Sequence, residues 1–129
     1  MTPTVTPIYA GLLALLLVLL SFGVIRARVR GGVSVGDGND KAVIKAMRVQ
    51  ANCAEYAPIG IVLLLLAELQ SAPVWALHLA GATLLAGRVF HAWGFGRSPQ
   101  IVWLRQLGMV LTFSMLTFTA IGIVARALS

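Results

Sequence analysis

The segment MRVQANCAEYAPIGIVLLLLA, residues 47–67, joins charged and polar side chains to a long apolar run. Arg48, Asn52 and Glu55 occupy its first half, and no charged residue follows Pro58 within it. The apolar part, residues 56–67, is too short to cross a bilayer core of about 30 Å, because crossing requires about 20 helical residues. It reaches that length only if the helix also includes the polar residues. The segment therefore predicts a membrane helix that carries a cation, an amide and a carboxylate.

The composition of the chain also indicates a membrane protein. Of its 129 residues, 59% are hydrophobic and only 11% are charged, whereas soluble domains average about 25% charged residues. Three further stretches, residues 1–25, 69–87 and 106–125, carry no formal charge. We therefore expect a single all-α domain over residues 1–129, a bundle of four transmembrane helices. Their expected ranges are about 7–28, 41–70, 73–93 and 101–127.

The first apolar stretch could instead be a cleaved secretory signal. Such signals begin with a positively charged region and end at a small-residue cleavage site. This chain begins with MTPTVTP and follows the apolar stretch with IRARVR, so we retain the stretch as a helix. The single cysteine, Cys53, excludes an intramolecular disulfide, and we expect it to be a small buried hydrophobe.

The basic residues indicate the orientation of the helices. Nine of the ten lie in or beside the connections between helices one and two and between helices three and four: Arg26, Arg28, Arg30, Lys41, Lys45, Arg48, Arg88, Arg97 and Arg105. The positive-inside rule makes that side cytoplasmic, with both termini outside. Topology thus explains the net charge of +6, and we expect no nucleic acid as a partner.

Several polar residues share the cytoplasmic half of the predicted helices. They are Arg48, Gln50, Asn52, Glu55 and Tyr56 on the second helix, Arg88 and His91 on the third, and Arg105 near the start of the fourth. Ionisable groups inside a membrane cost about 2.5–3.5 kcal/mol each, so they normally face a bundle interior or a wet cavity. Glu55 could pair with Arg48, with Arg88 or with an arginine of the first helix as an internal strut. The remaining cations predict an anionic partner, either lipid headgroups or an acidic small ligand.

A ligand with two carboxylates and one ammonium group would suit this set of side chains, and glutathione is such a molecule. Arginine binds carboxylates bidentately, Glu55 could hold the ammonium, and Asn52 or Gln50 could hold the peptide groups. A nearby arginine also stabilises a thiolate, the nucleophilic form of a thiol. Two distant histidines and one cysteine lack the spacing of a metal site, so we expect no metal.

Two motifs carry a family resemblance: RVQANCAEYAP at residues 48–58 and GRVFHAWGFGRS at residues 87–98. Together with the GDG loop before the second helix, they resemble the bacterial branch of the MAPEG family, the membrane-associated proteins in eicosanoid and glutathione metabolism. The resemblance implies a homotrimer in the bacterial inner membrane. Glutathione would bind between neighbouring subunits near the cytoplasmic side, so that membrane lipids and glutathione are the expected partners.

The resemblance also implies residue roles. Arg105 is the nearest equivalent of the arginine that polarises the thiol in the family's enzymes, and one of Arg26, Arg28 and Arg30, here taken as Arg28, should reach the neighbour's ligand. Arg48, Gln50, Asn52, Glu55, Tyr56 and Arg88 match glutathione-contacting positions. His91 and Phe95 stand where the eukaryotic leukotriene synthase has tyrosines; His91 can replace a donor or serve packing, whereas Phe95 cannot donate a hydrogen bond.

The implied function is a glutathione transferase, or a peroxidase, that acts on a lipophilic electrophile or hydroperoxide from the bilayer. Fold alone does not prove activity, so a non-enzymatic lipid-binding or scaffold protein is the alternative. A small multidrug transporter is a further one. Those transporters carry their key carboxylate in the first helix, where this chain has none, whereas Glu55 lies on the second.

Overall fold

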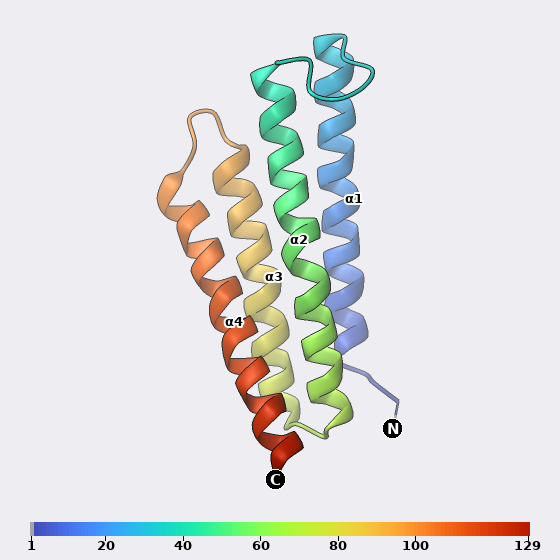
Figure 1. Cartoon of the computed structure of the whole chain (residues 1–129), viewed down its shortest axis with the longest axis vertical. Coiled ribbons are helices and arrows are strands. Elements are labelled where there is room, and N and C mark those ends of the chain that lie inside the picture. The colour runs from blue at the N-terminus through green and yellow to red at the C-terminus, as the bar shows by residue number, and fades with distance from the viewer. Residues whose placement is uncertain (1) are drawn as a thin grey trace.

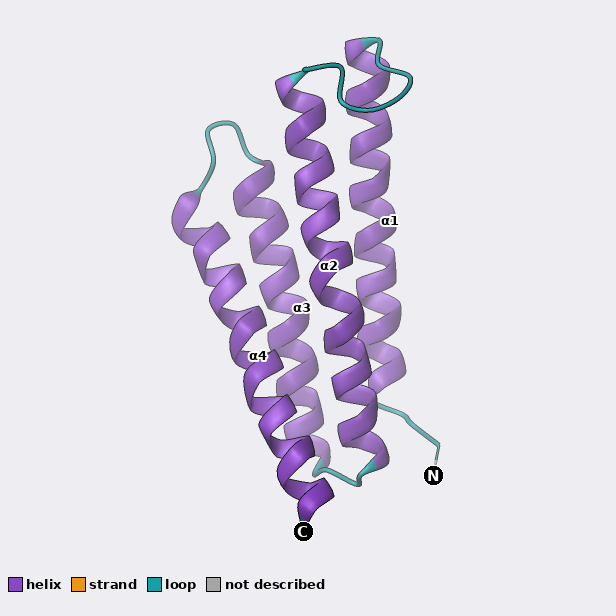
Figure 2. Ribbon diagram, viewed as in Figure 1, coloured by secondary structure: helices purple, strands orange, loops and turns teal. Residues whose placement is uncertain are grey.

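The computed structural model describes residues 2–129 as an antiparallel bundle of four helices, without a strand in that range (Figures 1 and 2). The helices are α1 (Thr6–Gly31), α2 (Lys41–Leu69), α3 (Val74–Gly96) and α4 (Val102–Leu128). The predicted all-α fold and its four helices are confirmed, with ends that differ by a few residues. The predicted trimer and the outward termini stay predictions.

Three helices, α1, α2 and α4, are long and apolar enough to cross a membrane. The third helix, α3, has 23 residues and carries Arg88 and two histidines, which lower its mean hydropathy. It packs against α1, α2 and α4. The chain ends and the α2–α3 connection lie at one end of the bundle, here called the termini end (Figure 1). The α1–α2 and α3–α4 connections lie at the other, here called the basic end.

The first two helices begin in different ways. Asp40 caps α2, because its side chain accepts hydrogen bonds from the backbone N–H groups of Ala42 at 2.8 Å and Val43 at 3.2 Å. No side chain of its own segment caps α1. Instead the buried Glu68, near the end of α2, accepts backbone hydrogen bonds from Thr4 at 2.6 Å, Val5 at 2.8 Å and Thr6 at 2.7 Å. Glu68 therefore acts as the N-cap of α1 from a different helix, because it accepts from the free N–H groups at the start of α1.

Three glycines let α3 and α4 approach backbone to backbone. A Cβ atom at Gly94 would lie 2.5 Å from the backbone nitrogen of Arg105, and one at Gly108 would lie 2.6 Å from the carbonyl oxygen of Gly87. Real Cβ atoms essentially never come that close to a backbone atom. Small residues at helix crossings are the usual means of close packing in membranes. The contact fixes Arg105, at the start of α4, beside the end of α3.

The glycine contact gives the first prediction. We expect Gly108→Ala to lower the stability of the folded protein by about 1–3 kcal/mol, as overpacking of a tight contact commonly does. Thermal unfolding in detergent measures this. Gly122→Ala is the matched control on the same helix, because a Cβ there meets nothing within 4 Å. An equal effect of the two substitutions would contradict the close α3–α4 approach.

The Glu68 contact gives the second prediction. Glu68→Ala removes an ionised acceptor and leaves three N–H groups of the α1 start without it, so we expect a loss of about 2–4 kcal/mol. Glu55→Ala serves as the control, because exposed ion pairs contribute only about 0–1 kcal/mol. Urea or thermal unfolding in detergent compares the two. If Glu68→Ala were no more destabilising than Glu55→Ala, Glu68 would not hold the start of α1.

Candidate functional site

The predicted site residues other than Glu55 lie in two clusters at the basic half of the bundle. The inner cluster lies between α2, α3 and α4 and consists of Asn52, Tyr56, Arg88, His91 and Arg105. The groove cluster lies between α1 and α2 and consists of Arg28, Arg48 and Gln50. Gln50 and Asn52 are two residues apart on α2, so their side chains point about 200° apart around the helix. Gln50 and Asn52 are therefore on different sides of α2, whereas Arg48, four residues before Asn52, lies only about 40° from it around the helix.

Arg88 is the centre of the inner cluster, and only 1% of it is exposed. Its Nε and Nη2 atoms donate to Thr112 Oγ1 on α4 at 3.0 and 2.8 Å. Its Nη1 atom donates to the carbonyl oxygen of Asn52 on α2 at 3.2 Å and to the side-chain oxygen of the same residue. The guanidinium also lies 5.3 Å from the centre of the Tyr56 ring. One buried cation thereby connects three helices.

Two partners of Arg88 are absent from the predicted site. Thr112 accepts from the guanidinium and donates its own hydroxyl proton to the Gly108 carbonyl at 2.8 Å. The Met109 sulfur lies 3.3 Å from Arg88 Nη2. Thr112 is fully buried, one turn after a glycine that packs on α3. The sequence of α4 alone does not distinguish it from the other hydroxyl residues of that helix.

Glu55 pairs with Arg48 rather than with Arg88. The Arg48 Nη1 and Glu55 Oε1 atoms are 3.7 Å apart, and the two side chains are 56% and 52% exposed. An exposed ion pair of this kind contributes little to stability. Either side chain can therefore leave its partner and bind a ligand instead. Of the three pairings of Glu55 that the sequence left open, the structure forms the one with Arg48, on the surface of α2.

His91 and Arg105 have different access to the surface. His91 is buried, and its ring centre lies 5.6 Å from that of Phe95. This position favours the packing role over direct contact with a ligand. Arg105 is only partly buried; its guanidinium carbon lies 3.9 Å from the centre of the Phe95 ring, and its Nη1 atom donates to Gln100 Oε1 at 3.0 Å. Arg105 is thus the accessible cation of the inner cluster.

The groove cluster lines a cavity of about 340 Å³ between α1 and α2, together with Ser21. Arg28 points into it and donates from Nε to the Gly36 carbonyl at 3.1 Å. Arg26 lines a different cavity. Of the three arginines near the end of α1, Arg28 is therefore the one that shares a cavity with Arg48 and Gln50.

The charge balance at the basic end is positive. The chain has four carboxylate side chains. Glu68 holds the start of α1, Asp40 caps α2, and Asp37 accepts from the backbone of Asn39 in the α1–α2 connection. Only Glu55 remains for the two clusters. Arg28 and Arg105 have no carboxylate within ion-pair distance among residues 2–129, so the clusters can accept an anionic ligand.

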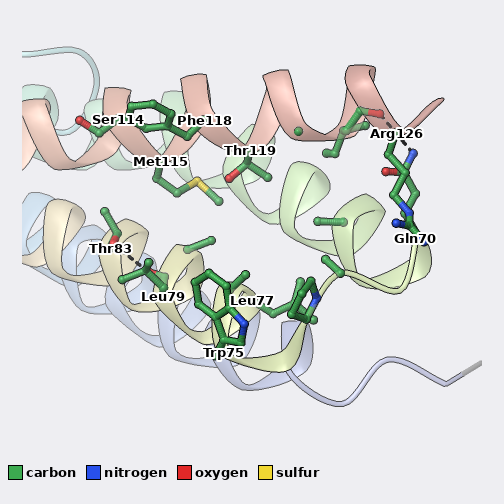
Figure 3. A pocket seen from close by; sticks show the side chains of 17 residues that line it. Gln70, Trp75, Leu77, Leu79, Thr83, Ser114, Met115, Phe118, Thr119 and Arg126 are labelled. Carbon is green, nitrogen blue, oxygen red and sulfur yellow. Dashed lines mark hydrogen bonds between the residues drawn. The ribbon is translucent and has the colours of Figure 1, made fainter. Parts of the chain in front are cut away.

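A second type of cavity lies at the termini end, between α3 and α4. It has a volume of about 520 Å³ and is lined mainly by apolar side chains such as Trp75, Leu79 and Met115 (Figure 3). Gln70 and Arg126 lie together at its outer edge (Figure 3). It contains none of the predicted site residues and offers one cation. The candidate site therefore remains at the basic end.

Comparison with known proteins agrees with the resemblance in the motifs. The inner membrane protein YecN of Escherichia coli strain K12 is 45% identical over 91 residues, which are 70% of this chain and 70% of that protein. The protein of the same name from Escherichia coli O6:H1 matches to the same extent. Residues 6–125 match the profile of the MAPEG family. Because that match covers nearly the whole described bundle, this chain belongs to the MAPEG family of membrane proteins.

Proposed function

We propose that the protein is a membrane-bound glutathione transferase of the bacterial inner membrane, with its site toward the cytoplasm. The observation that carries this proposal is the pair of cation-rich clusters beside α2. The partly exposed Arg105 belongs to one and Arg28 to the other, and Arg48 lines the cavity of Arg28 on the edge of the α2 face that carries Asn52 and Glu55. Family membership supports the reading, because the family includes glutathione-dependent enzymes.

The division into two clusters favours a site that two subunits share. A ligand in the α1–α2 cavity touches Arg28 and Gln50, whereas Arg105 and Asn52 belong to the far side of α2. In a closed ring of identical subunits, one surface patch of each copy meets a different patch of the next. A homotrimer of this kind would bring the groove cluster of one subunit to the inner cluster of its neighbour and complete the site.

Glutathione matches the side chains that the two clusters offer. Its two carboxylates would bind Arg28 and Arg48, because the planar guanidinium suits bidentate contact with a carboxylate. Its ammonium group would replace Arg48 as the partner of Glu55. Asn52 and Gln50 would hydrogen-bond the peptide groups, and Tyr56 would line the site. Arg88 acts as a positioning residue, because its donors are already directed to Asn52 and Thr112.

The chemical step depends on Arg105. A free thiol has a pKa of about 8.5, and a neighbouring cation favours its ionised form. With the guanidinium beside the glutathione sulfur, the thiol proton passes to water and the thiolate remains. The sulfur then forms a bond to an electrophilic carbon of a lipophilic molecule that enters from the bilayer, and the displaced electron pair leaves with the departing group. The product is a glutathione conjugate.

This mechanism gives the third prediction. Titration of the detergent-purified protein with glutathione near neutral pH should give a saturable ultraviolet absorbance of the thiolate. We expect Arg105→Ala to reduce that signal at least tenfold, since contacts to a charged group contribute about 1.5–3 kcal/mol. Arg97→Ala is the matched control, because Arg97 is a cation in the connection just before α4 and stacks on Trp93 at 4.8 Å.

The outcomes separate the two parts of the proposal. A folded Arg105→Ala protein that keeps the full thiolate signal would remove Arg105 from the chemistry. A folded wild-type protein that shows neither a thiolate signal nor binding of glutathione by calorimetry would contradict the proposed function and favour the non-enzymatic lipid-binding or scaffold protein. Loss of the thiolate signal in Arg97→Ala as well would mean that the positive charge of this region, rather than Arg105 in particular, favours the thiolate.

A further inference from the structure

A cavity of about 870 Å³ lies between α1 and α3, with α2 as its floor, at the basic half of the bundle. It is called here the α1–α3 groove. Helices α1 and α3 touch near the termini end. There the Tyr9 hydroxyl lies 3.0 Å from His78 Nδ1, and the Tyr9 ring packs on Gly81. Toward the basic end they separate, with α2 between them (Figure 1). Small residues, Ala42 and Ala46, form the floor there.

The walls of the α1–α3 groove are apolar and open. Leu15, Leu19 and Phe22 of α1 line it and are 67%, 67% and 62% exposed. Along α1 the lining extends from Leu15 to Arg26, a rise of about 16 Å at 1.5 Å per residue. This is close to half of a bilayer core of about 30 Å. The groove therefore has the length of one leaflet.

Cations stand at the basic end of this groove. Arg26 and Lys45 line it, and Ser98 adds a hydroxyl group. Lys45 is held in place, because its ammonium donates to the Arg97 carbonyl and to Ser98 Oγ, the latter at 3.1 Å. None of the four carboxylate side chains of the protein lines the groove. Its two cations thus have no anionic partner within it.

From this arrangement we infer that the α1–α3 groove binds an anionic phospholipid of the leaflet at the basic end. An acyl chain lies along Leu15, Leu19 and Phe22, and the phosphate contacts Arg26 and Lys45. Basic pockets between membrane helices on the cytoplasmic side are typical sites for anionic headgroups, and the distribution of basic residues predicts that orientation here. The site is separate from the proposed glutathione site, since Arg26 and Arg28 point about 200° apart on α1.

The fourth prediction tests the headgroup contact. Native mass spectrometry of the detergent-purified protein, titrated with phosphatidylglycerol, should show a bound lipid. Arg26→Gln should weaken this binding roughly fivefold, and the Arg26→Gln/Lys45→Gln double variant roughly thirtyfold. Phosphatidylcholine with the same acyl chains should bind more weakly and respond less to both changes, because its choline group offsets the charge of its phosphate. Arg30→Gln is the control, because Arg30 is an exposed cation on α1 that does not line the groove.

A second pair of variants tests the acyl-chain contact without changing charge. Gly23 lines the groove, and a Cβ there meets nothing within 4 Å, so Gly23→Leu fills the groove without disturbing the bundle. Gly11 has equally open surroundings on the same helix but lies outside the groove. Gly23→Leu should reduce phosphatidylglycerol binding, and Gly11→Leu should not.

Four outcomes would overturn the inference. Equal binding of the two lipids, or unchanged phosphatidylglycerol binding in the double variant, would mean that the cations do not select the ligand. Equal effects of Gly23→Leu and Gly11→Leu would place the lipid elsewhere. Retention of neither lipid by the folded protein would mean that something else, such as a second copy of the chain, covers the groove.

Discussion

The buried guanidinium of Arg88 constrains the rest of this bundle. A charged group among apolar membrane helices costs about 2.5–3.5 kcal/mol on insertion scales unless partners compensate. Here the compensation comes from two neighbouring helices, through the side-chain and backbone oxygens of Asn52 on α2 and the hydroxyl of Thr112 on α4. The three helices must therefore keep one relative rotation and depth. Displacement of any one of them would leave a buried cation without its acceptors.

The glycines of α3 and α4 allow the bundle to bury Arg88 and still keep a second cation of the inner cluster near the surface. Because Gly94 admits the backbone of Arg105 at close range, α4 begins beside the end of α3. Arg105 therefore remains near the surface at the basic end, while Arg88 is buried deeper in the same cluster. One cation serves the fold and the other is accessible to a ligand. On the far side of α2, Arg28 and Gln50 line a separate cavity.

Much of this architecture could be predicted from the sequence, because long uncharged runs mark the helices locally. The face of α2 that carries Arg48 and Glu55 follows from helical periodicity, and their 3.7 Å pair agrees with it. The sequence did not predict the partners of Arg88 or the hydrogen bonds of Glu68 to the start of α1. Both depend on how helices far apart in the sequence rotate against each other, and periodicity within one helix does not specify this. A buried Thr112 looks like any other hydroxyl in an apolar helix until α3 is placed beside it.

The most direct test of the proposed site asks whether two subunits share it. Arg28→Gln and Arg105→Ala chains are produced separately and together in equal amounts, and the thiolate absorbance of bound glutathione is measured for each preparation. A shared site predicts little signal from either variant alone. The mixture should recover about a quarter of the wild-type signal, since each interface joins two intact halves with a chance of one half times one half. A mixed preparation that gives no more signal than its components would contradict the shared site.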